Sequence, residues 1–162
     1  MKTPKKRKRQ RKTNYSTRMK LLKSGLPRVL VRRTNKYLVV QYVISNEAKD
    51  KVVLSVSSRE LLKNSWPKEL KGSLKSIPAA YLTGLMFGKK SKDKVKEMII
   101  DFGFQNSKKN TIIYSALKGV IDSGISLKAS KEIFPNEERL KGKHIKHDKL
   151  FETVKKSIEN EK

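Results

Sequence analysis

The chain has no cysteine, few acidic residues and no long apolar run among its 162 residues. Without cysteine it cannot form a disulfide framework, a thiolate nucleophile or a cysteine-based zinc site. The apolar run at residues 78–87, which contains no charge, covers roughly half of the ~20 apolar residues that a membrane-spanning helix needs. The basic N-terminus leads into no apolar segment either, so neither a membrane span nor a secretory signal is expected.

The shortage of acidic residues leaves a large positive charge. The sequence has 40 Lys and Arg against 15 Asp and Glu, which gives a formal net charge of +25 at pH 7. The residues before Glu47 include 15 Lys or Arg and no acid. Because a polyanionic partner relieves self-repulsion on this scale, we expect the front of the chain to contact nucleic acid.

The length suits one folded domain with tails. We expect three parts: a basic arm with a short helix (1–25), an α/β core (26–127) and a C-terminal extension with a terminal helix (128–162). Eight Lys or Arg in the first twelve residues, with almost no apolar side chain, predict that the arm is disordered until it meets its partner. The helical spacing of Tyr15, Met19 and Leu22 then predicts a short helix that ends near Gly25.

Strands are predicted after this short helix. Two β-branched runs joined by a Thr-Asn-Lys turn indicate a hairpin over residues 26–43. Residues 51–57 indicate a third strand, which follows a loop at residues 46–50. Alternation along the strands gives one apolar face and one mixed face. The mixed face of such an antiparallel platform is suited to approach RNA.

The uncharged stretch predicts a central helix that is buried on nearly every side. Pro78 suits the first helical position, and Ser76 is placed to cap the helix. Ala80, Gly84 and Gly88 recur at a spacing of four residues, which leaves a stripe where another backbone can come close. We therefore expect this helix to pack against the sheet and its neighbours.

The remaining elements complete an α/β fold. Residues 97–102 form a short apolar run typical of a buried fourth strand, and residues 111–125 predict a helix that ends near Gly124. A last helix is expected over residues 148–159, whereas residues 132–145 look too interrupted for regular structure. The predicted fold is a layered α/β domain with a mixed, mainly antiparallel four-stranded sheet covered by helices, plus a basic arm and a C-terminal tail.

Two pairs of side chains invite a catalytic interpretation. His144 and His147 are three residues apart but lack a third ligand, so contact with RNA or solvent is favoured over a metal. Asp101 and Asp122 would suit a two-metal nuclease only within a larger carboxylate cluster, which the sequence does not show. We therefore expect no enzyme activity and no cofactor or metal.

The basic arm by itself also fits a nuclear-localisation signal or an anionic membrane surface. The basic helix and hairpin that follow it favour structured RNA instead. Phosphates would then supply most of the affinity, while Tyr37, Gln41 and Asn35 would contact 2′-hydroxyls or splayed bases.

Several segments resemble a known family. TNYSTRMKLLKSGLPRVLVRRTNKYLVVQ, SSRELLKN, GSLKSIPAAYLTGLMFGKK, YSALKGVIDSGI and EIFPNEERLKGKHI occur in order from about Thr13 to Ile145. They are similar to the archaeal-type form of the large-subunit ribosomal protein family L-eighteen, which is universal and binds 5S rRNA. The specific markers are PAAYLTG followed by GKK, and IFPxxxR. The resemblance implies ribonuclease-H-like layering and a cytoplasmic location in the large ribosomal subunit.

The resemblance also implies a role without catalysis. A protein of this family binds 5S rRNA in the central protuberance and joins it to large-subunit rRNA, beside other large-subunit proteins such as one of the L-five family. The RNA-binding residues that the resemblance indicates are Arg7, Arg9, Arg11, Lys12, Tyr15, Arg18, Lys20, Arg28, Arg32, Arg33, Asn35, Lys36, Gln41, Ser58, Arg59 and Asn64. The alternatives are a free-standing RNA chaperone or structured-RNA-binding protein and, more distantly, a metal-dependent nuclease.

Overall fold

The computed structural model describes residues 3–47, 49–105, 108–145 and 148–160. Its sheet has five strands in the order β3-β2-β1-β4-β5. The strands are β1 (Arg28–Arg33), β2 (Leu38–Asn46), β3 (Lys49–Ser57), β4 (Glu97–Asp101) and β5 (Ser126–Leu127). β1 and β3 each pair antiparallel with β2, while β4 runs parallel to both β1 and β5. The predicted α/β class and mixed sheet are confirmed, with one strand more than expected.

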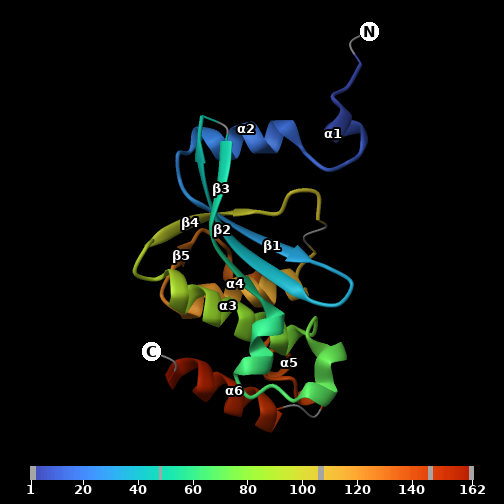
Figure 1. The fold of residues 1–162 in the computed structure, drawn as a ribbon, viewed down its shortest axis with the longest axis vertical. Coiled ribbons are helices and arrows are strands. Elements are labelled where there is room, and N and C mark those ends of the chain that lie inside the picture. The colour runs from blue at the N-terminus through green and yellow to red at the C-terminus, as the bar shows by residue number, and fades with distance from the viewer. Residues whose placement is uncertain (1–2, 48, 106–107, 146–147, 161–162) are drawn as a thin grey trace.

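Helices and short 3-10 turns accompany this sheet. The helices are α1 (Lys6–Arg9), α2 (Tyr15–Lys23), α3 (Ile77–Ser91), α4 (Ile112–Asp122), α5 (Glu137–Lys141) and α6 (Asp148–Asn160). The 3-10 turns are η1 (Ser58–Lys63), η2 (Lys68–Ser73), η3 (Lys131–Ile133) and η4 (Lys143–Ile145). Figure 1 shows α2 near the connected ends of β2 and β3, with α3 and α4 side by side against the sheet and α6 beyond them.

The helix α3 confirms the central helix that the uncharged stretch predicts. The Ser76 side chain caps it by accepting a hydrogen bond from the N–H of Ala79, and Pro78 is the second helical residue rather than the first. A Cβ atom added to Gly84 would lie 1.9 Å from the carbonyl oxygen of Ala116 in α4. The stripe of small residues therefore allows the backbones of α3 and α4 to approach closely.

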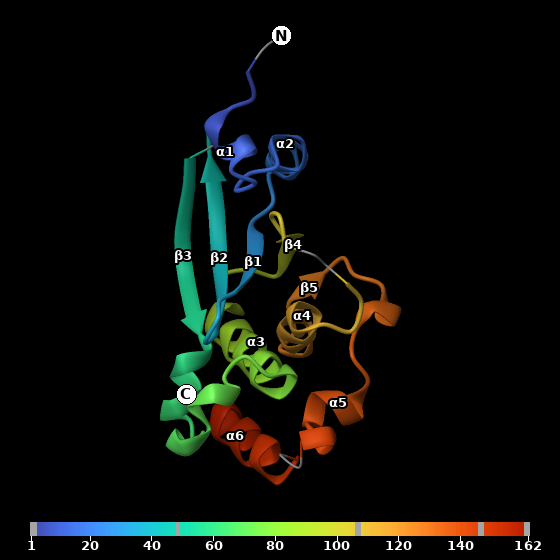
Figure 2. The ribbon, with the colours of Figure 1, turned by 90° about the vertical axis from the view of Figure 1, so that its right-hand side faces the viewer.

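One hydrophobic core lies between the sheet and the helices. The alternating residues Val29, Val31, Leu38 and Val40 are buried on the helix-covered face. The terminal helix α6 closes the core from the other side of α3 with Phe151, Val154 and Ile158, as its helical period predicts. Figure 2 shows α3 and α4 beside the strands β1 to β3, with α5 and α6 below these two helices.

Three local expectations were wrong. The predicted loop at 46–50 is a tighter turn, because Asn46 and Lys49 pair in the β2–β3 ladder. Residues 6–9 of the arm form a helical turn, consistent with the helix propensity of Lys and Arg. Within the segment expected to be irregular, α5 forms one short helix that ends at Gly142 in the left-handed conformation, which glycine adopts without strain.

The fifth strand, β5, had no counterpart in the prediction. It contains two residues, and Glu97↔Ser126 and Met98↔Leu127 are its pairs with β4. A strand this short has no alternation to recognise, so its pairing with β4 defines it. In the part of the chain that the structure describes, no helix is both long and apolar enough to cross a membrane.

Candidate nucleic-acid interface

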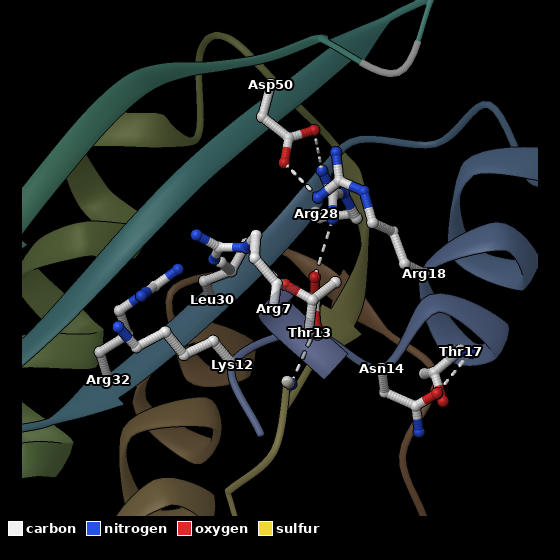
Figure 3. A pocket seen from close by; sticks show the side chains of 12 residues that line it. Arg7, Lys12, Thr13, Asn14, Thr17, Arg18, Arg28, Leu30, Arg32 and Asp50 are labelled. Carbon is white, nitrogen blue, oxygen red and sulfur yellow. Dashed lines mark hydrogen bonds and ion pairs between the residues drawn. The ribbon is translucent and has the colours of Figure 1, made fainter. Parts of the chain in front are cut away.

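A basic groove lies where the arm, α2 and the open side of β1 meet. We call it the arm groove; it encloses about 160 Å³. Its lining includes Arg7, Lys12, Arg18, Arg28, Leu30, Arg32, Asp50 and Asp101. Figure 3 shows the arginine side chains converging on it from the arm, α2 and β1. Leu30 and Arg32 are successive residues on the open face of β1, so the groove follows the strand.

Arg28 is the structural centre of the arm groove. Its side chain is only 2% exposed. One guanidinium nitrogen donates to Asp101 at 2.8 Å, and the other donates to Ser45 at 2.7 Å and to Asp50 at 2.5 Å. A buried charge of this kind is tolerated only when it is paired and hydrogen-bonded. The network therefore joins β1 to the β2–β3 ribbon and to the end of β4.

Asp50 connects the same network to α2. Its second carboxylate oxygen accepts a hydrogen bond from Arg18 at 2.7 Å, while Ser45 donates to the first at 2.6 Å. Burial raises the pKa of the Asp50 carboxyl, but the hydrogen bonds from Arg18 and Ser45 and the charge of Arg28 outweigh it. The net pKa lies below the ordinary value, so Asp50 stays ionised and holds two arginines in place.

This lowered pKa predicts how the Asp50 contribution depends on pH. A carboxyl whose pKa is lower in the folded state contributes stability that is fully present above its unfolded pKa of about 3.8. That stability is lost as the pH falls through the folded pKa. In urea unfolding, we expect wild type to be more stable than Asp50→Asn by a constant margin above about pH 5, and the margin to shrink below about pH 4. A margin that does not change with pH would contradict an ionised Asp50.

The arm is attached to α2 by local contacts. Arg7 donates a hydrogen bond to the Thr13 hydroxyl at 2.9 Å, and the Lys5 ammonium lies 4.9 Å from the centre of the Tyr15 ring. The Asn14 side chain caps α2 by accepting a hydrogen bond from the N–H of Thr17. These contacts place the cations of the arm beside the groove.

A second group of polar side chains surrounds the turn between β1 and β2. We call Arg33, Asn35, Lys36, Tyr37 and Arg59 the hairpin-turn cluster. The Arg59 guanidinium lies 4.0 Å from the centre of the Tyr37 ring, a cation–π contact. Arg59 is in the first turn of η1, which begins with a capping box formed by Ser57 and Glu60. The cluster continues the line of cations where β1 ends.

The structure thus divides the predicted RNA-binding residues between two surfaces and their surroundings. Arg7, Lys12, Arg18, Arg28 and Arg32 line the arm groove. The hairpin-turn cluster holds Arg33, Asn35, Lys36 and Arg59, and Gln41 lies on the open face opposite Leu30. The others in the arm and α2 are Arg9, Arg11, Tyr15 and Lys20. Of these, Arg9, Arg11 and Lys20 are exposed.

Three predicted contact residues are instead buried in the protein. Arg28 is enclosed by its carboxylate partners, as described above. The Ser58 hydroxyl accepts a hydrogen bond from the N–H of Leu38 at 3.0 Å, and Asn64 is buried at the end of η1. The polar groups of Arg28 and Ser58 therefore hold the strands that carry the exposed cations.

Sequence reasoning missed the acidic residues that organise the groove. Asp50 and Asp101 come from different strands, and their meeting at Arg28 depends on the parallel pairing of β1 with β4. The one available signal was that Asp50 is among the first acids after a long acid-free stretch. Phe104, beside the groove in the loop after β4, was also missed.

The two aspartates that suggested a nuclease, Asp101 and Asp122, are engaged by basic or hydroxyl side chains of the protein itself. Asp101 binds Arg28, whereas Asp122 accepts hydrogen bonds from Tyr81 at 2.9 Å and from Lys118 at 2.8 Å. Burial and the charge of Asp122 raise the pKa of the Tyr81 hydroxyl, which remains a donor. Among the described residues, no group of His, Cys, Asp or Glu is arranged to hold a metal ion. His147 lies outside those residues.

A cationic groove beside an open sheet face on an α/β body is the arrangement expected of the nucleic-acid-binding class of proteins. Residues 1–98 match a family described as "Ribosomal large subunit proteins 60S L5, and 50S L18". The chain belongs to this family, and the resemblance to L-eighteen proteins is confirmed.

Individual relatives agree with this assignment. The large ribosomal subunit protein uL18 of Korarchaeum cryptofilum is 45% identical over 140 residues, which cover 86% of this chain and 70% of that protein. The uL18 proteins of Methanothrix thermoacetophila and Methanoculleus marisnigri are 39% and 40% identical over 88% of this chain, and the matches cover 83% and 79% of their lengths. The protein is therefore a structural component of the large ribosomal subunit rather than an enzyme, and it associates with rRNA and other ribosomal proteins.

Proposed function

We propose that the protein binds 5S rRNA and helps to attach it to large-subunit rRNA in the central protuberance. The main support is the position of the positive charge. The acid-free front of the chain supplies the arm, α2 and the β1–β2 hairpin, and cations from the arm, α2 and β1 line one groove. The choice of 5S rRNA as the RNA partner rests on the resemblance to a 5S-rRNA-binding family.

The proposed contacts divide by chemistry. Exposed cations such as Arg7, Lys12 and Arg32 bind phosphates, and the release of counterions supplies most of the affinity. Asn35 and Gln41 offer both donors and acceptors, which suits 2′-hydroxyls and base edges. Arg28 is buried and supports binding indirectly, because it holds together the strands that present these groups.

The arrangement also supports contact with more than one RNA segment. The arm groove holds Arg32 and the hairpin-turn cluster holds the next residue, Arg33, so the two basic surfaces are adjacent along β1, although these two side chains alternate between the faces of the sheet. Neighbouring cationic surfaces can bind phosphates from two strands or two helices at once. A neighbouring ribosomal protein of the L-five family is a further proposed partner, on the resemblance alone.

Charge removal in the arm tests this proposal. We expect the variant Arg7→Gln, Arg9→Gln, Arg11→Gln to bind a 5S rRNA transcript more weakly than wild type. Each lost phosphate contact reduces the slope of log affinity against log salt concentration by about 0.7–0.9. Three contacts would therefore lower the slope by roughly two to three. The measurement is a filter-binding titration at several salt concentrations.

A matched control removes the same charge elsewhere. Lys68, Lys71 and Lys75 are exposed residues in and after η2, outside both basic surfaces. Their triple substitution by Gln should change the slope much less. Equal changes in the two variants would show that general charge, and not the arm, determines binding.

A further inference from the structure

Phe104 is a large aromatic side chain on the surface of a strongly cationic region. It is 47% exposed, while Phe102, two residues earlier, packs against Tyr114 with ring centres 5.6 Å apart. The other exposed large hydrophobic side chains among the described residues are the aliphatic or thioether groups of Met19, Ile44, Val52 and Val53. Covering an exposed phenyl ring with a binding partner removes apolar surface from water, which is favourable.

The loop that carries Phe104 is held on both sides of the ring. Before it, the Asp101 carboxylate accepts a hydrogen bond from the N–H of Gly103 at 2.9 Å, and Gly103 has a positive φ of 59° that permits the turn. After it, the Gln105 side chain donates to the carbonyl of Val31 at 2.9 Å. Asp101 is itself fixed by Arg28. The ring is therefore presented from a backbone that needs little reorganisation to bind.

Cations surround this ring. Phe104 lines a cavity of about 450 Å³ together with Arg7, Lys12 and Arg32, and this cavity shares those three cations with the arm groove. An RNA backbone held by the cations would bring its bases within reach of the ring. A phenyl group has no hydrogen bond to offer phosphate, but it stacks on any unpaired base, and aromatic stacking is a common way to recognise single-stranded or looped RNA.

We infer that Phe104 is a stacking platform for an unpaired base of the rRNA bound in the arm groove. This inference rests on the proposed function, since the phosphates of the same RNA occupy the groove. It adds a contact to a base where the predicted site residues provide mainly contacts to phosphate. The groove thereby distinguishes a bulged or looped RNA segment from a regular duplex, whose bases are already stacked.

Three substitutions at this position separate stacking from other effects. Phe104→Ala should weaken binding of a 5S rRNA transcript by roughly 5- to 150-fold, the range measured for loss of one base–aromatic stack. Phe104→Leu should also weaken it, because leucine is apolar but has no aromatic face. Phe104→Trp should retain affinity. The salt slope should stay at the wild-type value in all three, since no phosphate contact is removed.

A fluorescence signal gives a second, direct readout. Trp66 is buried, so it reports little on the surface. The indole that Phe104→Trp introduces should be quenched when the transcript is added, beyond any change seen in wild type. Thermal unfolding should show at most a small loss of stability for Phe104→Ala, because about half of this side chain is already exposed.

The outcomes distinguish this inference from the function on which it rests. Wild-type affinity in Phe104→Ala or in Phe104→Leu, or an unquenched indole, would overturn the stacking role while leaving 5S rRNA binding intact. If wild type binds a large-subunit rRNA fragment but not the 5S transcript, the proposed function fails, and the same variants on that fragment decide the stacking role. If wild type binds neither RNA, both are overturned.

Discussion

Replacing Gly84 by alanine is expected to destabilise the protein by roughly 2 kcal/mol, and replacement by leucine by more than about 3 kcal/mol. The added Cβ atom would lie 1.9 Å from the carbonyl oxygen and 2.8 Å from the carbonyl carbon of Ala116. Those atoms belong to the backbone of α4, so relief requires the two helices to move apart. Such a loss is large beside the 5–15 kcal/mol that typically stabilises a domain.

The predicted destabilisation by Gly84→Ala is opposite in sign to the usual effect of this substitution in a helix. In an exposed helix, replacing glycine by alanine stabilises by about 0.5–1 kcal/mol through helix propensity and reduced backbone entropy. Gly72 provides a control, because a Cβ atom there would meet nothing within 4 Å. Urea unfolding followed by circular dichroism should show a clear loss for Gly84→Ala and almost none for Gly72→Ala. A stabilised Gly84→Ala variant would refute the close approach of α3 and α4.

Replacing Arg28 by methionine should destabilise the protein by about 3 kcal/mol or more, because removing one partner of a buried ion pair leaves the other charge uncompensated. Methionine keeps much of the apolar volume but cannot satisfy Asp101, Asp50 or Ser45. The loss should also loosen α2, because the shared carboxylate of Asp50 links Arg18 of α2 to Arg28 of β1. We therefore expect weaker RNA binding as well.

Arg33, at the other end of β1, provides a control for the Arg28 substitution. Arg33 is on the same strand but is exposed, and substitutions at such positions usually change stability by less than about 0.5 kcal/mol. Arg33→Met should therefore leave the midpoint of thermal unfolding nearly unchanged, while Arg28→Met lowers it markedly. Similar midpoints for the two variants would mean that the carboxylate network contributes little to the fold.

Much of the fold follows from local patterns. The alternation in the β1–β2 hairpin, and the uncharged stretch behind Pro78, identified the strands and α3 because each pattern reflects burial of one face. The strand β5 and the helix α5 were missed for the opposite reason. Each is too short to carry a period, and each depends on a partner or a cap that only the folded chain supplies.

In the candidate site, too, some features follow from the local sequence and others depend on tertiary contacts. A count of charges located the basic surface, since most Lys and Arg of the acid-free stretch are exposed. The same count cannot separate an exposed cation such as Arg32 from the buried Arg28, two residues away on the same face of β1. The difference arises because Asp50 and Asp101 approach only one of them, and that approach is a matter of tertiary pairing.

Mapping RNA–protein crosslinks in purified native large subunits tests the central claim most directly. The account predicts that peptides from the arm, α2 and the β1–β2 hairpin are crosslinked to 5S rRNA, with further crosslinks to large-subunit rRNA. Crosslinks from these peptides only to protein, or only to rRNA other than 5S, would contradict it.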